Sequence, residues 1–237
     1  MKRFALIGHP VAGSLSPVLF AAAYGGRYAY DLVDAPFPEA WSAFLDRYHG
    51  INVTAPYKQD AFASVDRLTP AAQETGAVNL AVKTPDGILG FNTDVDGVTG
   101  ALRETGLSFA DALVVGTGGA ARAAVAAARR LGCRVTVTGR SPEKAAVLGC
   151  EAVSLTRAAS LQPDLVLYTL PGSAPVPAGL PLAQAIVLEA EYRHPALIGH
   201  PCRQYIHGKR WLLHQAIAGY SLFTGEQPSV EEMFRAL

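Results

Sequence analysis

The sequence predicts an α/β protein of two domains: an N-terminal α/β domain and a doubly wound domain with a parallel sheet. Two observations lead to this expectation. Short apolar runs alternate with segments of helical composition along most of the chain, and a glycine-rich loop beginning at Gly116 opens a second series of such alternations. The length of 237 residues lies between one and two typical domains, and because half of the residues are apolar, the chain can bury a sizeable core.

The N-terminal part of the chain is expected to alternate strands with helices, which implies a parallel sheet. Phe4 to Gly8 is an apolar run closed by glycine and proline, and Ser16 with Pro17 is typical of the N-cap and first turn of a helix. A break at 85–87 predicts a hairpin. The expected elements are strands at 4–8, 28–33 and 50–54, helices at 16–23, 38–48 and 58–65, and a hairpin over 76–91.

The second series of elements has the pattern of a compact doubly wound domain. The expected elements are helices at 96–105, 120–131 and 142–148, strands at 112–116, 135–138, 165–167 and 186–188, and two closing helices at 211–223 and 230–237. We therefore expect one domain at 96–209. The other comprises 1–95 together with 210–237, so that the C-terminal helices return to the first domain.

Charge and cysteine content exclude several classes of protein. The 20 Lys and Arg balance the 20 Asp and Glu, and only 17% of residues are charged, which argues against binding to nucleic acid or to an anionic membrane. No stretch approaches the roughly 20 apolar residues of a membrane span, and the apolar run at 4–7 is too short for a signal peptide. Three cysteines without a C-x-x-C pair favour a reducing cytoplasm. The six histidines show no metal-ligand spacing, so no metal is expected.

The glycine-rich loop predicts dinucleotide binding. Gly116, Gly118, Gly119 and Ala120 directly follow an expected strand and open an expected helix, which gives G-x-G-x-x-A together with Ala121. This pattern provides a tight turn, a close backbone approach to a pyrophosphate and an anion site at a helix N-terminus. A plain turn between a strand and a helix is the alternative interpretation.

The end of the next expected strand favours NADP over NAD. An NAD site would place a carboxylate there to bind the ribose hydroxyls, but the sequence has Gly139, Arg140 and Ser141. The guanidinium of Arg140 is suited to a 2′-phosphate, with Ser141 and Lys144 assisting.

Four polar clusters in the first domain lie at expected strand ends or turns, where open sheets bind their ligands. Taken singly, each side chain has a simpler explanation as a helix cap, a turn residue or an exposed lysine. The clusters are Gly13 to Pro17, Asn52 to Lys58, Gly76 to Asn79, and Gly90 to Gly97.

Taken together and in this order, the clusters resemble the shikimate dehydrogenase family. The matching patterns are S-x-S-P, N-V-T-x-P-x-K, G-A-V-N and N-T-D-x-x-G, followed by G-x-G-G-A and, at 208–216, G-x-x-x-L-x-x-Q-A. The resemblance spans essentially the whole chain. It implies a cytoplasmic NADP-dependent enzyme, monomeric or homodimeric, that interconverts 3-dehydroshikimate and shikimate in aromatic amino acid biosynthesis, with the dinucleotide bound by a Rossmann-like domain.

The resemblance also implies roles for particular residues. Hydride transfer to a ketone leaves an alkoxide that must gain a proton, and an ammonium beside a carboxylate can supply it. Lys58 and Asp94 are the implied catalytic pair. The implied substrate-binding residues are Ser14, Ser16, Asn52, Thr54, Asn79, Tyr192 and Gln215, and Gly208 joins the cofactor-binding set.

Departures from the family pattern leave alternatives open. Gly139 stands where asparagine is expected in an N-R-T turn, and Tyr168 and Leu170 replace the asparagine and threonine of N-x-T-P-x-G on the nicotinamide side. One alternative is a quinate or shikimate dehydrogenase that prefers NAD. Another is a shikimate-binding relative with weak cofactor binding. A folate-pathway methylene dehydrogenase is disfavoured, because the paired serines and N-T-D would then have no purpose.

Overall fold

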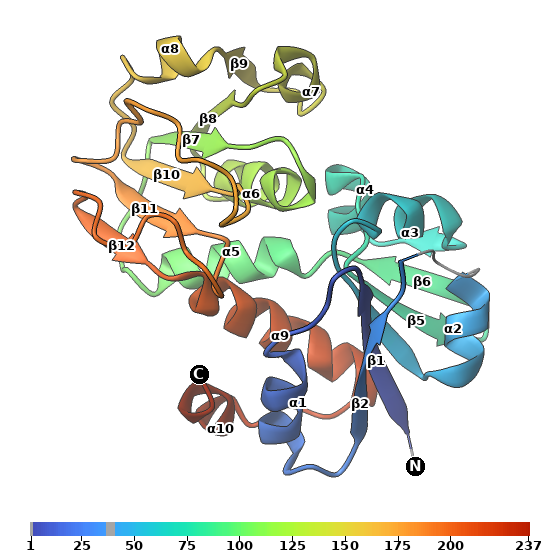
Figure 1. The fold of residues 1–237 in the computed structure, drawn as a ribbon. Coiled ribbons are helices and arrows are strands. Elements are labelled where there is room, and N and C mark those ends of the chain that lie inside the picture. Colours follow the sequence, from blue (N-terminus) through green and yellow to red (C-terminus); the bar gives the residue numbers. More distant parts are fainter. Residues whose placement is uncertain (1, 37–40) are drawn as a thin grey trace. The chain divides into compact units, whose positions relative to one another are not determined.

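The computed structural model describes residues 2–36 and 41–237 (Figure 1). The chain divides into two compact units, which we call unit 1 (residues 1–94 and 213–237) and unit 2 (residues 95–212). The expected start of the second helix, near residue 38, lies outside the described residues. Within the described ranges, no helix is both long enough and apolar enough to cross a membrane.

Unit 1 is built on a six-stranded sheet in the order β2-β1-β3-β5-β6-β4. Its strands are β1 (Arg3–Gly8), β2 (Ala29–Asp34), β3 (Gly50–Val53), β4 (Arg67–Leu68), β5 (Leu80–Thr84) and β6 (Gly87–Phe91), and its helices α1 (Ser16–Tyr24), α2 (Trp41–Arg47), α3 (Lys58–Ser64), α4 (Pro70–Thr75) and α10 (Val230–Arg235). Two further helices, α5 (Asp94–Arg103) and α9 (Gly208–Thr224), carry the chain from one unit to the other. The short elements β4 and α4 are additional to the sequence expectation.

The sheet of unit 1 is mixed, whereas alternation alone predicts a parallel one. Strands β1, β2 and β3 pair in parallel, but β5 runs antiparallel to both β3 and β6. The hairpin explains the difference, because a tight turn joins only antiparallel strands. Residues 76–79 are not part of the strand: Gly76, with a φ of 59°, ends α4 in the left-handed conformation.

Alternate side chains of β1, which lies between β2 and β3, pack into two apolar layers on opposite faces of the sheet. The ring of Phe4 packs on Phe20 of α1 and stacks on Phe223 of α9, with centroid distances of 5.2 and 5.1 Å. On the opposite face, Ala5 and Ile7 join the apolar cluster that includes residues of α2, α3 and α4. The sheet is therefore covered by helices on both faces, as Figure 1 shows.

Unit 2 has an entirely parallel six-stranded sheet in the order β12-β11-β10-β7-β8-β9, which confirms the doubly wound prediction. Its strands are β7 (Asp111–Val115), β8 (Arg134–Thr138), β9 (Glu151–Val153), β10 (Leu165–Tyr168), β11 (Ile186–Glu189) and β12 (Gln204–Ile206), and its helices α6 (Gly119–Arg130), α7 (Pro142–Ala146) and α8 (Leu155–Ala158). Three short elements, β9, α8 and β12, are additional to the sequence expectation and have only three or four residues each.

The connection from β10 to β11 contains no helix in the described structure, although crossovers between parallel strands are usually helical. Proline accounts for this, because it lacks the N–H that a helix interior needs. Four prolines occupy this stretch, at 171, 175, 177 and 181. The resulting irregular segment places Thr169, Leu170, Pro171 and Pro177 around a pocket described below.

Candidate active site

Lys58 and Asp94 form an ion pair inside unit 1. Each is the first residue of its helix, Lys58 of α3 and Asp94 of α5. The Nζ atom of Lys58 lies 2.6 Å from Oδ2 of Asp94, and the two side chains are 18% and 11% exposed. Such a pair is shielded from water but still reachable by a ligand, and two of the three ammonium protons remain for other acceptors. The expected catalytic pair is therefore assembled.

Asp94 is held in place by a buried polar group of the preceding turn. The backbone N–H of Asp94 donates to Oδ1 of Asn92, and Nδ2 of Asn92 donates to the Thr75 hydroxyl and to the carbonyl of Ala77. Asn92 is only 2% exposed and Thr75 only 1%. This chain of hydrogen bonds fixes the start of α5, and with it the carboxylate, against the loop after α4.

Thr93 links two of the expected substrate residues. Its backbone N–H donates to Oδ1 of Asn79 at 2.8 Å, and its hydroxyl accepts from Nδ2 of Asn79 at 3.1 Å. The same hydroxyl lies 3.4 Å from Oε1 of Gln215, on helix α9. Asn52 joins this network, because its Nδ2 donates to the carbonyl of Asn79. Sequence reasoning named Asn52, Asn79 and Gln215 but missed Thr93, whose only signal was its place between Asn92 and Asp94.

We expect Thr93→Val to lower the free energy of unfolding by about 1–3 kcal/mol, because the buried Asn79 amide then loses a hydrogen-bond partner while the shape of residue 93 is kept. Thr93→Ser, which keeps the hydroxyl, is the matched control and is expected to lose less. Urea denaturation of the three proteins measures the difference. Equal stability of the valine variant and the wild type would contradict this role.

Ser14, Ser16 and Thr54 follow the C-terminal ends of the adjacent parallel strands β1 and β3. The hydroxyl of Ser14 lies 3.2 Å from that of Ser16 and accepts from the Ser16 backbone N–H. The expectation that Ser16 caps α1 is wrong. Leu15, whose side chain has no acceptor, holds the N-cap position, and the N–H of Ser16, the first residue of the helix, donates to the Ser14 hydroxyl.

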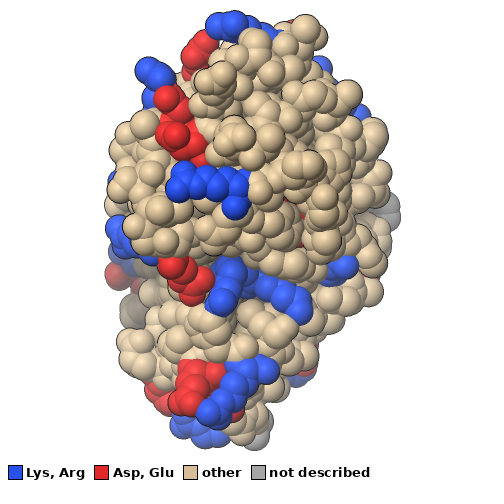
Figure 2. Space-filling view, turned by 90° about the vertical axis from the view of Figure 1, so that its left-hand side faces the viewer, with Lys and Arg blue, Asp and Glu red and all other residues tan. Residues whose placement is uncertain are grey.

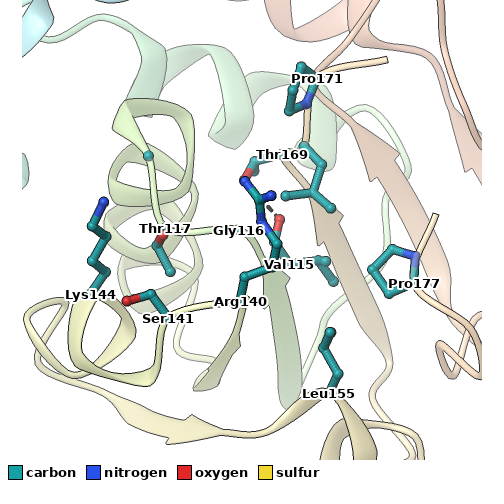
Figure 3. Close-up of a pocket in the computed structure, with 13 residues that line it drawn as sticks. Val115, Gly116, Thr117, Arg140, Ser141, Lys144, Leu155, Thr169, Pro171 and Pro177 are labelled. Atoms are coloured by element: carbon teal, nitrogen blue, oxygen red, sulfur yellow. Dashed lines mark hydrogen bonds between the residues drawn. The ribbon is translucent and has the colours of Figure 1, made fainter. Parts of the chain in front are cut away.

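A pocket of about 480 Å³ in unit 2 gathers much of the expected cofactor set (Figure 3). Gly116 has a φ of 123°, and a Cβ there would lie 2.3 Å from the Thr169 hydroxyl, so only glycine fits. Figure 3 shows the Arg140 side chain extending toward Thr169. The residues lining the pocket are Val115, Gly116, Thr117, Gly118, Gly139, Arg140, Ser141, Lys144, Leu155, Thr169, Leu170, Pro171 and Pro177.

Three expected cofactor residues are not among those that line the pocket. Gly119 and Ala120 begin helix α6 directly behind the loop. Gly208 begins α9, where a Cβ would lie 2.6 Å from the carbonyl oxygen of Glu189, so close packing explains this glycine. Tyr192, expected at the substrate, belongs to unit 2, whereas the other expected substrate residues belong to unit 1.

Tyr168 and Leu170 both depart from the N-x-T-P-x-G pattern expected on the nicotinamide side, but they have different environments. Leu170 lines the pocket. Tyr168 does not: it is fully buried in an apolar cluster of unit 2, and its hydroxyl has no hydrogen-bond partner in the described structure. Burial, and then the charge of Glu189, raise the pKa of Tyr168. The substitution at 168 therefore alters the core of the domain and not the wall of the pocket.

Glu189 is a fully buried carboxylate that was not among the predicted site residues. It accepts hydrogen bonds from the backbone N–H groups of Ala196 and Leu197 and from the Tyr205 hydroxyl, at 2.6, 3.1 and 2.6 Å. Burial, and then the hydrogen bond to Glu189, raise the pKa of Tyr205 well above its usual value, so that its hydroxyl stays protonated and donating. These bonds tie the loop after β11, which includes Tyr192, to the end of the sheet.

Charge and metal-ligand chemistry at the surface are sparse. On the face shown in Figure 2, acidic and basic side chains lie in small groups separated by uncharged surface. Among the described residues, no group of three or more His, Cys, Asp or Glu side chains is arranged to hold a metal ion. The polar groups described above are accordingly the ones on which a functional assignment rests.

Comparison with known proteins points to one family. The model described as the shikimate dehydrogenase substrate binding domain matches residues 6–81. The chain is similar to proteins named shikimate dehydrogenase (NADP(+)). It is 35% identical to that of Acidiphilium cryptum, over 98% of this chain and 94% of the relative. It is 38% identical to that of Thermus thermophilus, over 81% of this chain and 79% of the relative.

Solved structures give the same result. The chain is similar to shikimate 5-dehydrogenase from a second strain of Thermus thermophilus in complex with NADP(H) and shikimate, with a TM-score of 0.86 and 33% identity over all of both chains. It is also similar to shikimate dehydrogenase of Mycobacterium tuberculosis, with a TM-score of 0.86 and 32% identity over 100% and 98% of the two chains.

Proposed function

The chain belongs to the shikimate dehydrogenase family, and from this premise we propose that it interconverts shikimate and 3-dehydroshikimate with NADP as the hydride carrier. The observation that carries the proposal is the shielded Lys58–Asp94 ion pair, which lies in the unit whose sequence matches the substrate binding domain of the family. Reversible oxidation of a secondary alcohol requires such a group to exchange a proton with the substrate oxygen.

The pocket of unit 2 fits NADP. Its lining combines the glycine loop, which allows a close backbone approach to a diphosphate, with the cationic side chains of Arg140 and Lys144. None of the described lining residues carries a carboxylate that would repel a 2′-phosphate. This lining favours NADP over NAD. The sequence argument for weak cofactor binding rested on Tyr168 and Leu170, and because Tyr168 is buried away from the pocket, only Leu170 still supports it.

The residues of unit 1 are proposed to bind the substrate around its reacting carbon. The hydroxyls of Ser14, Ser16 and Thr54 bind the carboxylate, and Asn79 and Gln215 bind ring hydroxyls. Asn52 supports Asn79, because its Nδ2 atom donates a hydrogen bond of 3.2 Å to the backbone carbonyl of Asn79. Tyr192 is retained in the proposed set on the family resemblance.

Lys58 and Asp94 are proposed to move the proton. When bound, the cofactor supplies or accepts the hydride at the ring carbon. In the reducing direction Lys58 donates a proton from Nζ to the developing alkoxide, and in the oxidising direction the neutral amine takes it back. Asp94 accepts a hydrogen bond from Nζ, which orients the remaining protons and stabilises the ammonium form.

A steady-state assay with shikimate and NADP tests this function directly, and Arg140→Ala tests the cofactor assignment. We expect Arg140→Ala to reduce kcat/KM for NADP by about 10–100-fold, because a charge-assisted contact to the 2′-phosphate is lost, and to change kcat/KM for NAD little. Arg134→Ala is the matched control, since Arg134 begins β8, the strand that Arg140 follows, but pairs with Asp111 at the surface. No turnover by the wild type, or equal losses with both cofactors, would contradict the proposal.

A further inference from the structure

Thr117 and Gly139 lie side by side beyond the ends of two paired strands. Val115 and Thr138 are register partners at the ends of β7 and β8, and the Gly116 N–H donates to the carbonyl of Thr138 at 2.8 Å. The chain therefore leaves both strands at the same edge of the sheet. Both residues line the pocket of unit 2.

The side chain of Thr117 fills the space that a side chain at position 139 would need. A Cβ built on Gly139 would lie 2.9 Å from Cγ2 of Thr117, and its next contact is the carbonyl carbon of Gly116 at 4.0 Å. The Thr117 methyl group is thus the one close contact that a Cβ at position 139 would make among the described residues. The two positions are sterically coupled, with the larger residue on the glycine loop.

Thr117 lies on the same side of the pocket as the cationic side chain of Lys144. Figure 3 shows Thr117, Ser141 and Lys144 along one side of the pocket. The Ser141 hydroxyl already donates to Oε2 of Glu143 at 2.9 Å. Within the described residues, the Thr117 hydroxyl has no hydrogen-bond partner. Thr117 therefore offers a hydroxyl donor that no protein group uses.

We propose that Thr117 is a specificity-determining residue, whose hydroxyl donates a hydrogen bond to the 2′-phosphate of NADP while its methyl group requires glycine at position 139. This inference rests on the proposed use of NADP. It assigns to the glycine loop a part in choosing between NADP and NAD, in addition to the cations that follow β8. A neutral hydroxyl donor adds a hydrogen bond to a phosphate oxygen without adding charge.

Calorimetric titration of NADP and NAD into wild type, Thr117→Val and Thr117→Ser separates the hydroxyl from the shape of the residue. Valine keeps the size and branching of threonine but lacks the donor, so we expect the Kd for NADP to rise about tenfold and the Kd for NAD to change less than about twofold. Serine keeps the donor and is expected to stay within about threefold of wild type for both. An unchanged NADP affinity in Thr117→Val, or equal losses for the two cofactors, would overturn the assignment.

A double-variant cycle tests the steric coupling. Gly139→Ala places a Cβ against the Thr117 methyl, and we expect about tenfold weaker NADP binding because the Thr117 side chain must move away from its proposed contact with the phosphate. Thr117→Ser/Gly139→Ala removes that methyl and keeps the hydroxyl, so the Kd should return to within about threefold of Thr117→Ser. If the double variant binds as weakly as Gly139→Ala, the coupling is refuted.

The same titrations distinguish failure of this inference from failure of the proposed function. If the wild type binds NADP and the Thr117 variants behave like it, only the role of Thr117 is lost. If the wild type itself binds no NADP, both the cofactor assignment and the inference are wrong. Thermal unfolding of each variant without cofactor identifies any loss of affinity that arises from a destabilised unit 2.

Discussion

Replacing Lys58 with methionine is expected to lower kcat for shikimate oxidation by about three orders of magnitude, with a much smaller change in the KM for shikimate. Methionine keeps most of the length of the side chain but has no proton to exchange. The variant also leaves the shielded Asp94 carboxylate without its cation, 2.6 Å from the former ammonium. Stopped-flow and steady-state measurements of NADPH formation give kcat and KM separately.

Lys83→Met is the matched control for Lys58→Met. Lys83 lies on β5 of the same unit and also pairs with an aspartate, Asp46, at 2.7 Å, but both side chains are more than half exposed. Because an exposed ion pair contributes little to stability and Lys83 is outside the proposed site, we expect kcat to stay within about twofold of wild type. A loss for Lys83→Met similar to that for Lys58→Met would indicate a general charge effect.

The double variant Lys58→Met/Asp94→Asn tests whether the two groups act as one unit. If Asp94 works by orienting the Lys58 ammonium, its replacement costs little once the ammonium is gone, and the double variant should be about as slow as Lys58→Met alone. Losses that multiply would show that Asp94 contacts the substrate independently. A kcat for Lys58→Met within about tenfold of wild type would remove Lys58 from the proton-transfer step.

The sequence predicted the positions of the long elements well because their signals are local. Apolar runs ending in glycine indicated β1 and β7, and the loop was identified by its glycines, of which Gly116 has the positive φ and the close contact that require glycine. Lys58 and Asp94 were named as a pair from the resemblance to a family, and the structure shows that each begins a helix, Asp94 two residues before the expected start.

Features that depend on contacts between distant segments were not predictable from local pattern. The antiparallel placement of β5 follows from its pairing with β3, which no local sequence encodes. The same holds for Thr93, whose hydroxyl meets Asn79 and Gln215, and for Tyr168, whose burial depends on how β10 packs between β7 and β11. Each of these residues has a side chain that would suit either a core or a site.

Replacing Glu189 with alanine is expected to lower the free energy of unfolding by about 3–5 kcal/mol. The variant removes the fully buried acceptor of three hydrogen bonds, from the N–H groups of Ala196 and Leu197 and from the Tyr205 hydroxyl, and leaves these buried or half-buried donors without it. It also opens a cavity the size of the lost side chain. Urea denaturation followed by circular dichroism measures the change.

Tyr168→Phe is the control from the adjacent strand, because Tyr168 and Glu189 are register partners in β10 and β11. The Tyr168 hydroxyl is buried without a partner in the described structure, so its removal should leave stability within about 1 kcal/mol of wild type or raise it. The two substitutions thus remove polar groups from neighbouring positions, but only Glu189→Ala is expected to destabilise the protein. A small effect of Glu189→Ala would show that the donors of the loop find other acceptors. Glu189 ties down the loop that includes Tyr192, so if Tyr192 has its proposed role in binding shikimate, the loss of Glu189 should raise the KM for shikimate even at temperatures where the variant remains folded.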